Sequence, residues 1–134
     1  MTGMQGVTMR KRQRGQAMTE FAVLIPVMIM LVLGIIEFGR AFYYYSSIAN
    51  AAREGARYGV VHAADQDGIR AAAVSNAVGL GLTFSNIDAQ CLPSGICAFG
   101  NQVRVTVTYN FTSVAPLIPS FTMNRTATMR IESP

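Results

Sequence analysis

The sequence predicts an α+β fold, in which a long N-terminal helix is followed by a short second helix and a small antiparallel sheet. Three observations carry this prediction. An uncharged apolar run extends from Phe21 to Ile36. An alanine-rich stretch at 46–62 continues in a helical pattern, and apolar residues then alternate with polar ones from Gln102 onward. A period of two indicates a half-buried strand, whereas the earlier steps of three and four indicate a helix.

The chain begins with a basic segment at residues 1–15 that has no apolar periodicity, and we expect it to be unstructured. Four of the eleven basic residues of the protein lie directly before Gly15, namely Arg10, Lys11, Arg12 and Arg14. The remaining seven are balanced by seven acids, so the net charge of +4 comes from this segment. Basic residues beside an apolar span remain in the cytoplasm. The prediction is therefore a cytoplasmic leader at 1–15 and an extracytoplasmic C-terminal part.

The apolar run predicts a single membrane-spanning helix. It is slightly shorter than the roughly 20 residues that a span requires. We therefore place the transmembrane part of the helix at 16–45, which includes Glu20, Glu37 and Arg40. Glu37 and Arg40 are three residues apart, so they share one helix face and partly neutralise each other. A cleaved secretory signal is the alternative, but no small-residue cleavage motif follows the apolar run.

The helix is predicted to continue outside the membrane to about His62. Small residues at helical spacing, among them Ala52, Gly55 and Gly59, form one face that permits close approach of another element. This face could pack on its own domain or on neighbouring subunits. Because the helix extends well beyond the membrane, we favour the second interpretation slightly.

The rest of the extracytoplasmic part, 46–134, is predicted to hold a second helix and about three strands. Asp65 or Asp67 is a candidate N-cap for a helix over 68–78, which ends at two glycines. The strongest strand signal runs over 103–111. A second alternating strand covers 121–131, and a further short strand is plausible at 86–91.

The two cysteines, Cys91 and Cys97, flank a turn-forming Pro-Ser-Gly sequence. We favour a disulfide between them because the predicted topology places this part in an oxidising compartment. Two unpaired buried thiols remain the alternative.

Several classes of function are excluded or disfavoured by composition. Two cysteines and one histidine cannot form a four-ligand zinc site of Cys and His, and no metal or other cofactor is expected. No basic patch follows Gly15, so a nucleic-acid partner is not expected. No convergent polar constellation indicates catalysis or a small-molecule substrate, and we assign no catalytic residue. His62 alone supports no catalytic set.

One motif resembles a known signal. Gly15 is followed by four residues, then by Glu20 and Phe21, and then by the apolar span. This arrangement resembles the prepilin signal of the tight-adherence (Tad) pilus system. The sequences at 34–40 and 50–58, Gly-Ile-Ile-Glu-Phe-Gly-Arg and Asn-Ala-Ala-Arg-Glu-Gly-Ala-Arg-Tyr, resemble the TadE-like minor pilin family. The resemblance covers about residues 14–60.

The resemblance implies a pilin-like fold and a structural role in the assembly of an adhesive pilus. A prepilin peptidase would cleave between Gly15 and Gln16, and Glu20 would help to position the subunit. The implied partners are the membrane, the peptidase and other pilins or pseudopilins, and the implied location is the bacterial inner membrane. A carboxylate in a membrane segment independently indicates function. The simpler interpretation of Glu20 is an ordinary carboxylate near the lipid headgroups.

The leading hypothesis is therefore a minor pilin or pseudopilin that is not an enzyme. The alternative from another class is a permanently anchored single-pass protein that presents an extracytoplasmic binding module. Substitution of Gly15 separates the two hypotheses, because only the first requires processing.

Overall fold

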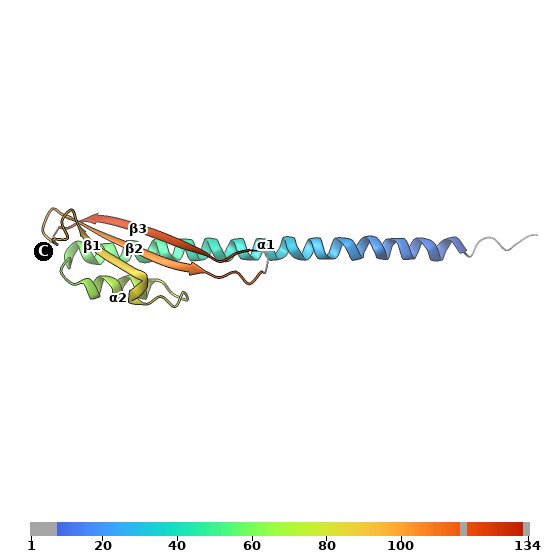
Figure 1. The fold of residues 1–134 in the computed structure, drawn as a ribbon, viewed down its shortest axis with the longest axis horizontal. Coiled ribbons are helices and arrows are strands. Elements are labelled where there is room, and N and C mark those ends of the chain that lie inside the picture. The colour runs from blue at the N-terminus through green and yellow to red at the C-terminus, as the bar shows by residue number, and fades with distance from the viewer. Residues whose placement is uncertain (1–7, 116–117, 133–134) are drawn as a thin grey trace, which may run out of the picture. The chain divides into compact units, whose positions relative to one another are not determined.

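The computed structural model describes residues 8–115 and 118–132, with side chains from Gly15 onward. The chain divides into two units, one that ends at Phe38 and one that begins at Gly39. We call them the helical unit and the globular unit and describe each by itself. The predicted α+β class is confirmed, with one long helix, one short helix and a three-stranded antiparallel sheet (Figure 1).

The long helix α1 extends over Thr8–Val61, which is 54 residues, and it continues without a break through Pro26. The prediction that 1–15 is unstructured is therefore wrong from Thr8 onward, and residues 1–7 lie outside the described residues. Arginine, lysine, glutamine and methionine are good helix formers. Because extending a helix is much easier than starting one, the leader continues the helix of the apolar run.

In the globular unit, α2 occupies Gln66–Asn76 and begins at the N-cap Asp65, whose side chain accepts a hydrogen bond from the Gly68 N–H. The predicted second helix is confirmed, although it begins and ends two residues earlier than expected. A short 3-10 helix, η1, follows at Phe84–Asn86 and leads directly into the sheet.

The sheet contains β1 at Ile87–Leu92, β2 at Gln102–Phe111 and β3 at Phe121–Arg130. The strands pair antiparallel in the order β1-β2-β3 (Figure 1). Val105 of β2 lies opposite Ala89 on one side and Ala127 on the other. This register places the apolar residues of all three strands on the same face, as the alternation predicted.

The core of the globular unit lies between this face and the two helices. β2 contributes Val103, Val105 and Val107, and none of these side chains is exposed. The helices contribute small and β-branched residues that are equally buried, namely Ile48, Ala51 and Ala56 of α1 and Ile69 and Ala73 of α2. Polar side chains occupy the other face, where the hydroxyls of Thr106 and Thr126 lie 3.0 Å apart.

The small residues of α1 pack within this core, which corrects our expectation that they meet neighbouring subunits. A Cβ atom on Gly55 would lie 3.1 Å from Ala73 Cβ and 3.2 Å from a Val105 methyl. A Cβ atom on Gly59 would lie 3.0 Å from a Val103 methyl. Ala52 is also buried. Since α2 and β2 already occupy this face, Ala52, Gly55 and Gly59 bring the chain's own elements together.

Candidate functional site

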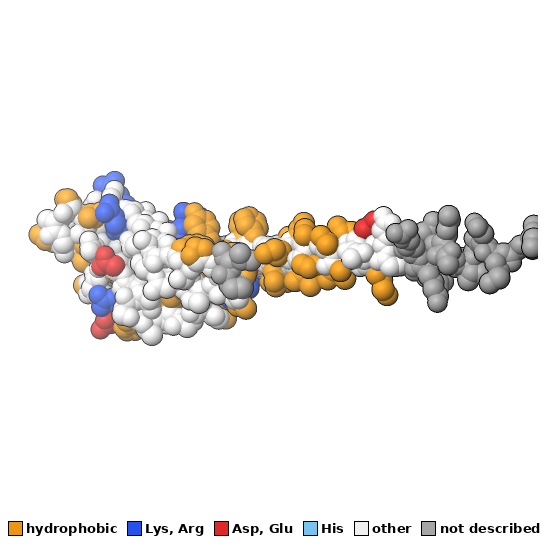
Figure 2. Space-filling view, turned by 45° about the vertical axis from the view of Figure 1, so that its right-hand side comes forward, with side chains coloured by type: hydrophobic (Ala, Val, Ile, Leu, Met, Phe, Trp, Pro, Cys, Tyr) orange, Lys and Arg blue, Asp and Glu red, His pale blue; other side chains and the backbone are white. Residues whose placement is uncertain are grey.

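The helical unit consists of one helix whose large apolar side chains have almost no cover within the structure. From Met18 to Ile36 these side chains are 43–79% exposed. Figure 2 shows hydrophobic side chains along the visible face of this helix, with no other element covering them. By length and composition this helix could cross a membrane, and it is the one such helix in the described part of the chain. A helix that is apolar on all sides requires an apolar surrounding, which a bilayer supplies.

Gly15 lies inside α1, and beyond its own helical turn nothing lies within 4 Å of a Cβ built on it. The Thr19 hydroxyl donates to the Gly15 carbonyl oxygen at 2.8 Å and to the Gln16 carbonyl oxygen at 3.0 Å. The bond between Gly15 and Gln16 is therefore helical and sterically open. The sequence could not reveal the contact from Thr19, because it depends on Gly15 being helical.

Glu20 and Phe21 are exposed on the next turn of the helix. Glu20 lies four positions after Gln16, so the two residues share a face of α1. Phe21 is 66% exposed and begins the run of uncovered apolar side chains. The structure thus brings Gln16 and Glu20 to one face and keeps Gly15, Glu20 and Phe21 accessible.

Glu37 and Arg40 lie where the apolar run ends, and both are more enclosed than the residues before them. Glu37 is only 5% exposed. The Arg40 guanidinium carbon lies 5.8 Å from the ring centre of Tyr44 and 5.5 Å from that of Phe111, which are cation–π distances. Arg40 therefore packs on aromatic rings of the globular unit. The mutual neutralisation of Glu37 and Arg40 stays a prediction.

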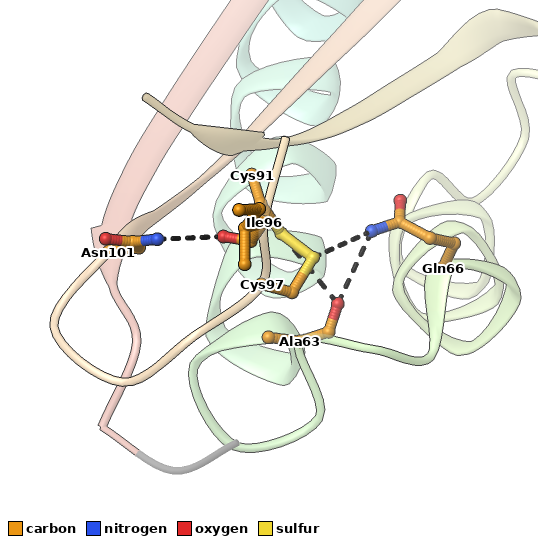
Figure 3. The surroundings of a disulfide bond; sticks show 6 residues. All are labelled: Ala63, Gln66, Cys91, Ile96, Cys97 and Asn101. Carbon is orange, nitrogen blue, oxygen red and sulfur yellow. Dashed lines mark hydrogen bonds between the residues drawn. A yellow bond between two sulfur atoms is a disulfide. The ribbon is translucent and has the colours of Figure 1, made fainter. Parts of the chain in front are cut away.

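Cys91 and Cys97 form a disulfide, which agrees with the pairing that we favoured (Figure 3). The Gln66 side-chain amide donates to the Ala63 carbonyl oxygen at 3.4 Å and lies 3.6 Å from Cys97 Sγ. On the other side, the Asn101 amide donates to the Ile96 carbonyl oxygen at 2.9 Å. The disulfide thus fastens the β1–β2 connection beside the start of α2.

A polar cluster at the end of α1 was not predicted from the sequence. The Tyr58 ring stacks on His62 with centres 4.6 Å apart, and its hydroxyl donates to Asp65 Oδ2 at 3.0 Å. The hydrogen bond from the Gly68 N–H, together with that from Tyr58, holds the pKa of Asp65 below its usual range. Because this cluster is on the surface and organises the turn between the helices, we assign it a structural role.

These features define a class of protein: a small α+β unit carried on an N-terminal helix that could span a membrane once. The comparison with protein families is more specific. Residues 15–57 match the family of TadE-like proteins, and over this segment the predicted resemblance is confirmed. The match supports a protein associated with the Tad pilus system.

The matched segment begins at Gly15 and ends within α1, so it contains the apolar run and the small-residue face but neither α2 nor the sheet. No curated protein and no solved structure gives a significant match to the chain. The likeness to known proteins is therefore confined to α1.

Proposed function

We propose that the protein is a minor pilin or pseudopilin of a Tad-type pilus, which a prepilin peptidase cleaves between Gly15 and Gln16. The observation that supports this most is the accessible motif of Gly15, Glu20 and Phe21 at the start of an uncovered apolar helix within the TadE-like segment. In this proposal residues 1–15 are the cytoplasmic leader, 16–45 cross the inner membrane and 46–134 are extracytoplasmic. The protein then acts as a structural subunit.

Cleavage requires that the helix opens at the scissile bond, because a peptidase needs access to an extended backbone. Glycine supports this step. It destabilises a helix interior by about 1 kcal/mol relative to alanine, and it presents no side chain to the enzyme. The Thr19 hydroxyl bond to the Gly15 carbonyl opposes opening, but it is exposed to solvent and correspondingly weak.

Cleavage would change the role of Glu20. With Gln16 as the new N-terminus, Glu20 lies in the first turns of the mature helix, where the helix dipole favours an anion. It becomes a partner for the new N-terminal amine of a neighbouring subunit within the apolar surrounding. An ion pair there offsets the free-energy cost of placing a carboxylate in the bilayer. A carboxylate kept in a membrane segment despite this cost indicates function.

The environment of the uncovered side chains between Met18 and Ile36 then changes once during assembly. Lipid covers them in the membrane-inserted precursor, and neighbouring pilin helices cover them after extraction into a pilus. Because lipid chains and leucine side chains are about equally apolar, exchange between these surroundings is not opposed by the hydrophobic effect.

The decisive experiment compares two glycines of the same helix. Gly15 and Gly34 both have no atom within 4 Å of a built Cβ. We expect the wild-type chain and the Gly34→Val variant to lose residues 1–15 in cells that contain the peptidase, as seen by mass spectrometry of the purified protein. The Gly15→Val variant should keep its leader.

Two results would overturn the proposal. One is an intact leader on the wild-type chain in peptidase-containing cells, and the other is equal cleavage of the Gly15→Val variant. Either result would favour a permanently anchored single-pass protein that presents the globular unit as a binding module.

A further inference from the structure

We propose that one end of the globular unit binds a phospholipid bilayer surface directly, through an aromatic patch that α1, the β2–β3 connection and the start of β3 form together. We call this the interfacial patch and define it by Phe42, Tyr43, Tyr45, Val114 and Phe121. The inference requires α1 to be inserted in the membrane, but it does not require cleavage after Gly15.

Ring contacts within the globular unit hold the patch together. Tyr44 packs on Phe111 of β2 with ring centres 5.9 Å apart, and Phe111 packs on Phe121 of β3 at 5.0 Å. Phe111 is only 1% exposed. The end of β2 and the start of β3 are thereby fixed against residues 40–45 of α1.

The five residues of the patch expose apolar surface on several sides of residues 42–45 of α1, in the β2–β3 connection and at the start of β3. Val114 is 78% exposed, Phe42 66%, Tyr43 56%, Phe121 45% and Tyr45 43%. Figure 2 shows hydrophobic side chains on the surface at this end of the globular unit. Several exposed large apolar groups at one end of a domain usually mark an interaction site.

The position of the patch along the chain identifies the bilayer as its partner. Residues 39–45 follow the apolar run in the same helix. Phe42 comes six residues after Ile36, which is about 9 Å at 1.5 Å per residue. The polar headgroup region on each side of a bilayer is about 5–7 Å thick. Phe42 therefore lies a few ångströms beyond this region if the hydrocarbon core ends at Ile36, and so close to the membrane–water boundary that tyrosine and other aromatic side chains favour.

The charges at the patch fit the same partner. The Arg125 guanidinium lies over the Tyr45 ring, with its carbon 4.5 Å from the centre, and one of its nitrogens donates to the Tyr45 hydroxyl at 2.6 Å. Arg40 lies over Tyr44 and Phe111. An arginine beside an aromatic ring combines attraction to anionic headgroups with partial insertion of the ring.

Tyr44 is not part of the patch, because its ring packs on Phe111 and on Tyr109, with ring centres 5.2 Å apart for the second pair. Val114 and Phe121 belong to the patch although they are about 70 or more residues further along the chain. We infer that the globular unit is fixed to the bilayer surface at a second point besides the span.

The absence of tryptophan from the chain permits a direct test. The full-length variants Val114→Trp and Phe121→Trp each carry one fluorophore in the patch. Phe99→Trp is the matched control, because Phe99 is 72% exposed and lies in the β1–β2 connection, near the opposite end of β2. A ten-residue strand separates the two ends by about 30 Å.

Each variant is reconstituted in vesicles of phosphatidylcholine and phosphatidylglycerol, with and without brominated acyl chains. We expect bromolipid to quench the tryptophans at positions 114 and 121 at least about twofold more strongly than the one at 99, because interfacial side chains reach about 5–10 Å into the boundary. Their emission should also lie at shorter wavelength than that of the control.

Equal quenching at all three positions would overturn the proposal. A blue-shifted but unquenched tryptophan at 114 and 121 would also overturn it and would indicate that a second copy of the chain covers the patch. A cooperative urea-unfolding transition with a midpoint close to that of the wild-type chain shows that each variant is folded. Because no peptidase is present, the outcome is independent of the processing experiment.

Discussion

The two units of this protein share one helix but use it in different ways. Between Met18 and Ile36 the large side chains of α1 are largely exposed, whereas Ile48, Ala51 and Ala56 of the same helix are completely buried. The glycines differ in the same way, because Gly34 lies in open space and Gly59 lies against Val103. A helix with continuous backbone hydrogen bonds, such as α1, can therefore be packed by its own domain along one part and not along another. The first part depends on an external apolar surrounding, while the second is stabilised by its own domain.

The sharpest contrast between the units is expected from two phenylalanines. Phe111 is 1% exposed in the globular unit, and Phe38 is 74% exposed at the end of the helical unit. Phe111→Ala should lower the free energy of unfolding by about 4 kcal/mol, since it removes a buried ring and leaves a cavity. Phe38→Ala should change it by less than about 0.5 kcal/mol.

Urea unfolding of the full chain in detergent micelles measures both variants. All five tyrosines lie between residues 43 and 109, so tyrosine fluorescence reports on the globular unit alone. Similar unfolding midpoints for Phe111→Ala and Phe38→Ala would contradict the division into two units.

A slightly smaller effect is expected from overfilling the contact between α1 and the sheet. Gly59→Leu forces a side chain into space already filled by Val103 and Ile69, and it should destabilise the globular unit by about 3 kcal/mol. Gly34→Leu is the matched control and should leave tyrosine-detected unfolding unchanged. If Gly59→Leu were tolerated equally well, the small-residue face would not be a packing contact within the chain.

The disulfide provides a test within the globular unit. The double variant Cys91→Ser with Cys97→Ser should have a free energy of unfolding about 2 kcal/mol lower than that of the wild type. The effect is modest because a disulfide that closes a short loop restricts the unfolded chain only a little. A reducing agent should lower the unfolding midpoint of the wild-type chain by the same amount and leave the double variant unaffected. A wild-type chain that is insensitive to reduction would contradict a stabilising role.

The smallest effect concerns pH and the cluster around Asp65. Its folded-state pKa is depressed by the Gly68 and Tyr58 hydrogen bonds, so its contribution is fully present above the unfolded pKa of about 4. That contribution is lost as the pH falls through the depressed folded value. The Asp65→Asn variant should therefore lose less stability than the wild-type chain when the pH is lowered below about 4.

Tyr58→Phe removes one of the two donors and should give an intermediate pH profile. The measurement is the urea midpoint as a function of pH. An Asp65→Asn profile that coincides with the wild type would show that this carboxylate contributes nothing to acid sensitivity.

The sequence by itself determined those features that depend on local pattern. The alternation over 103–111 predicts β2 because strand side chains repeat every two residues, and the uncharged run over 21–36 predicts a span because every helix face is apolar. The Gly15–Glu20–Phe21 spacing is read directly from the chain, and the family match begins at the same glycine. The Cys91–Cys97 pairing was favoured because the predicted topology places both cysteines in an oxidising compartment, and a turn can close their six-residue separation.

Only the tertiary structure decided which side chains meet across the chain. Gly55 and Gly59 could have faced a neighbour or the domain itself, and the choice depends on where Ala73, Val103 and Val105 lie. Likewise, Phe121 joins the aromatics of α1 because antiparallel pairing brings the end of β2 beside the start of β3. Local periodicity specifies the face on which a residue lies. The partner of that face depends on long-range packing, which no short stretch of sequence encodes.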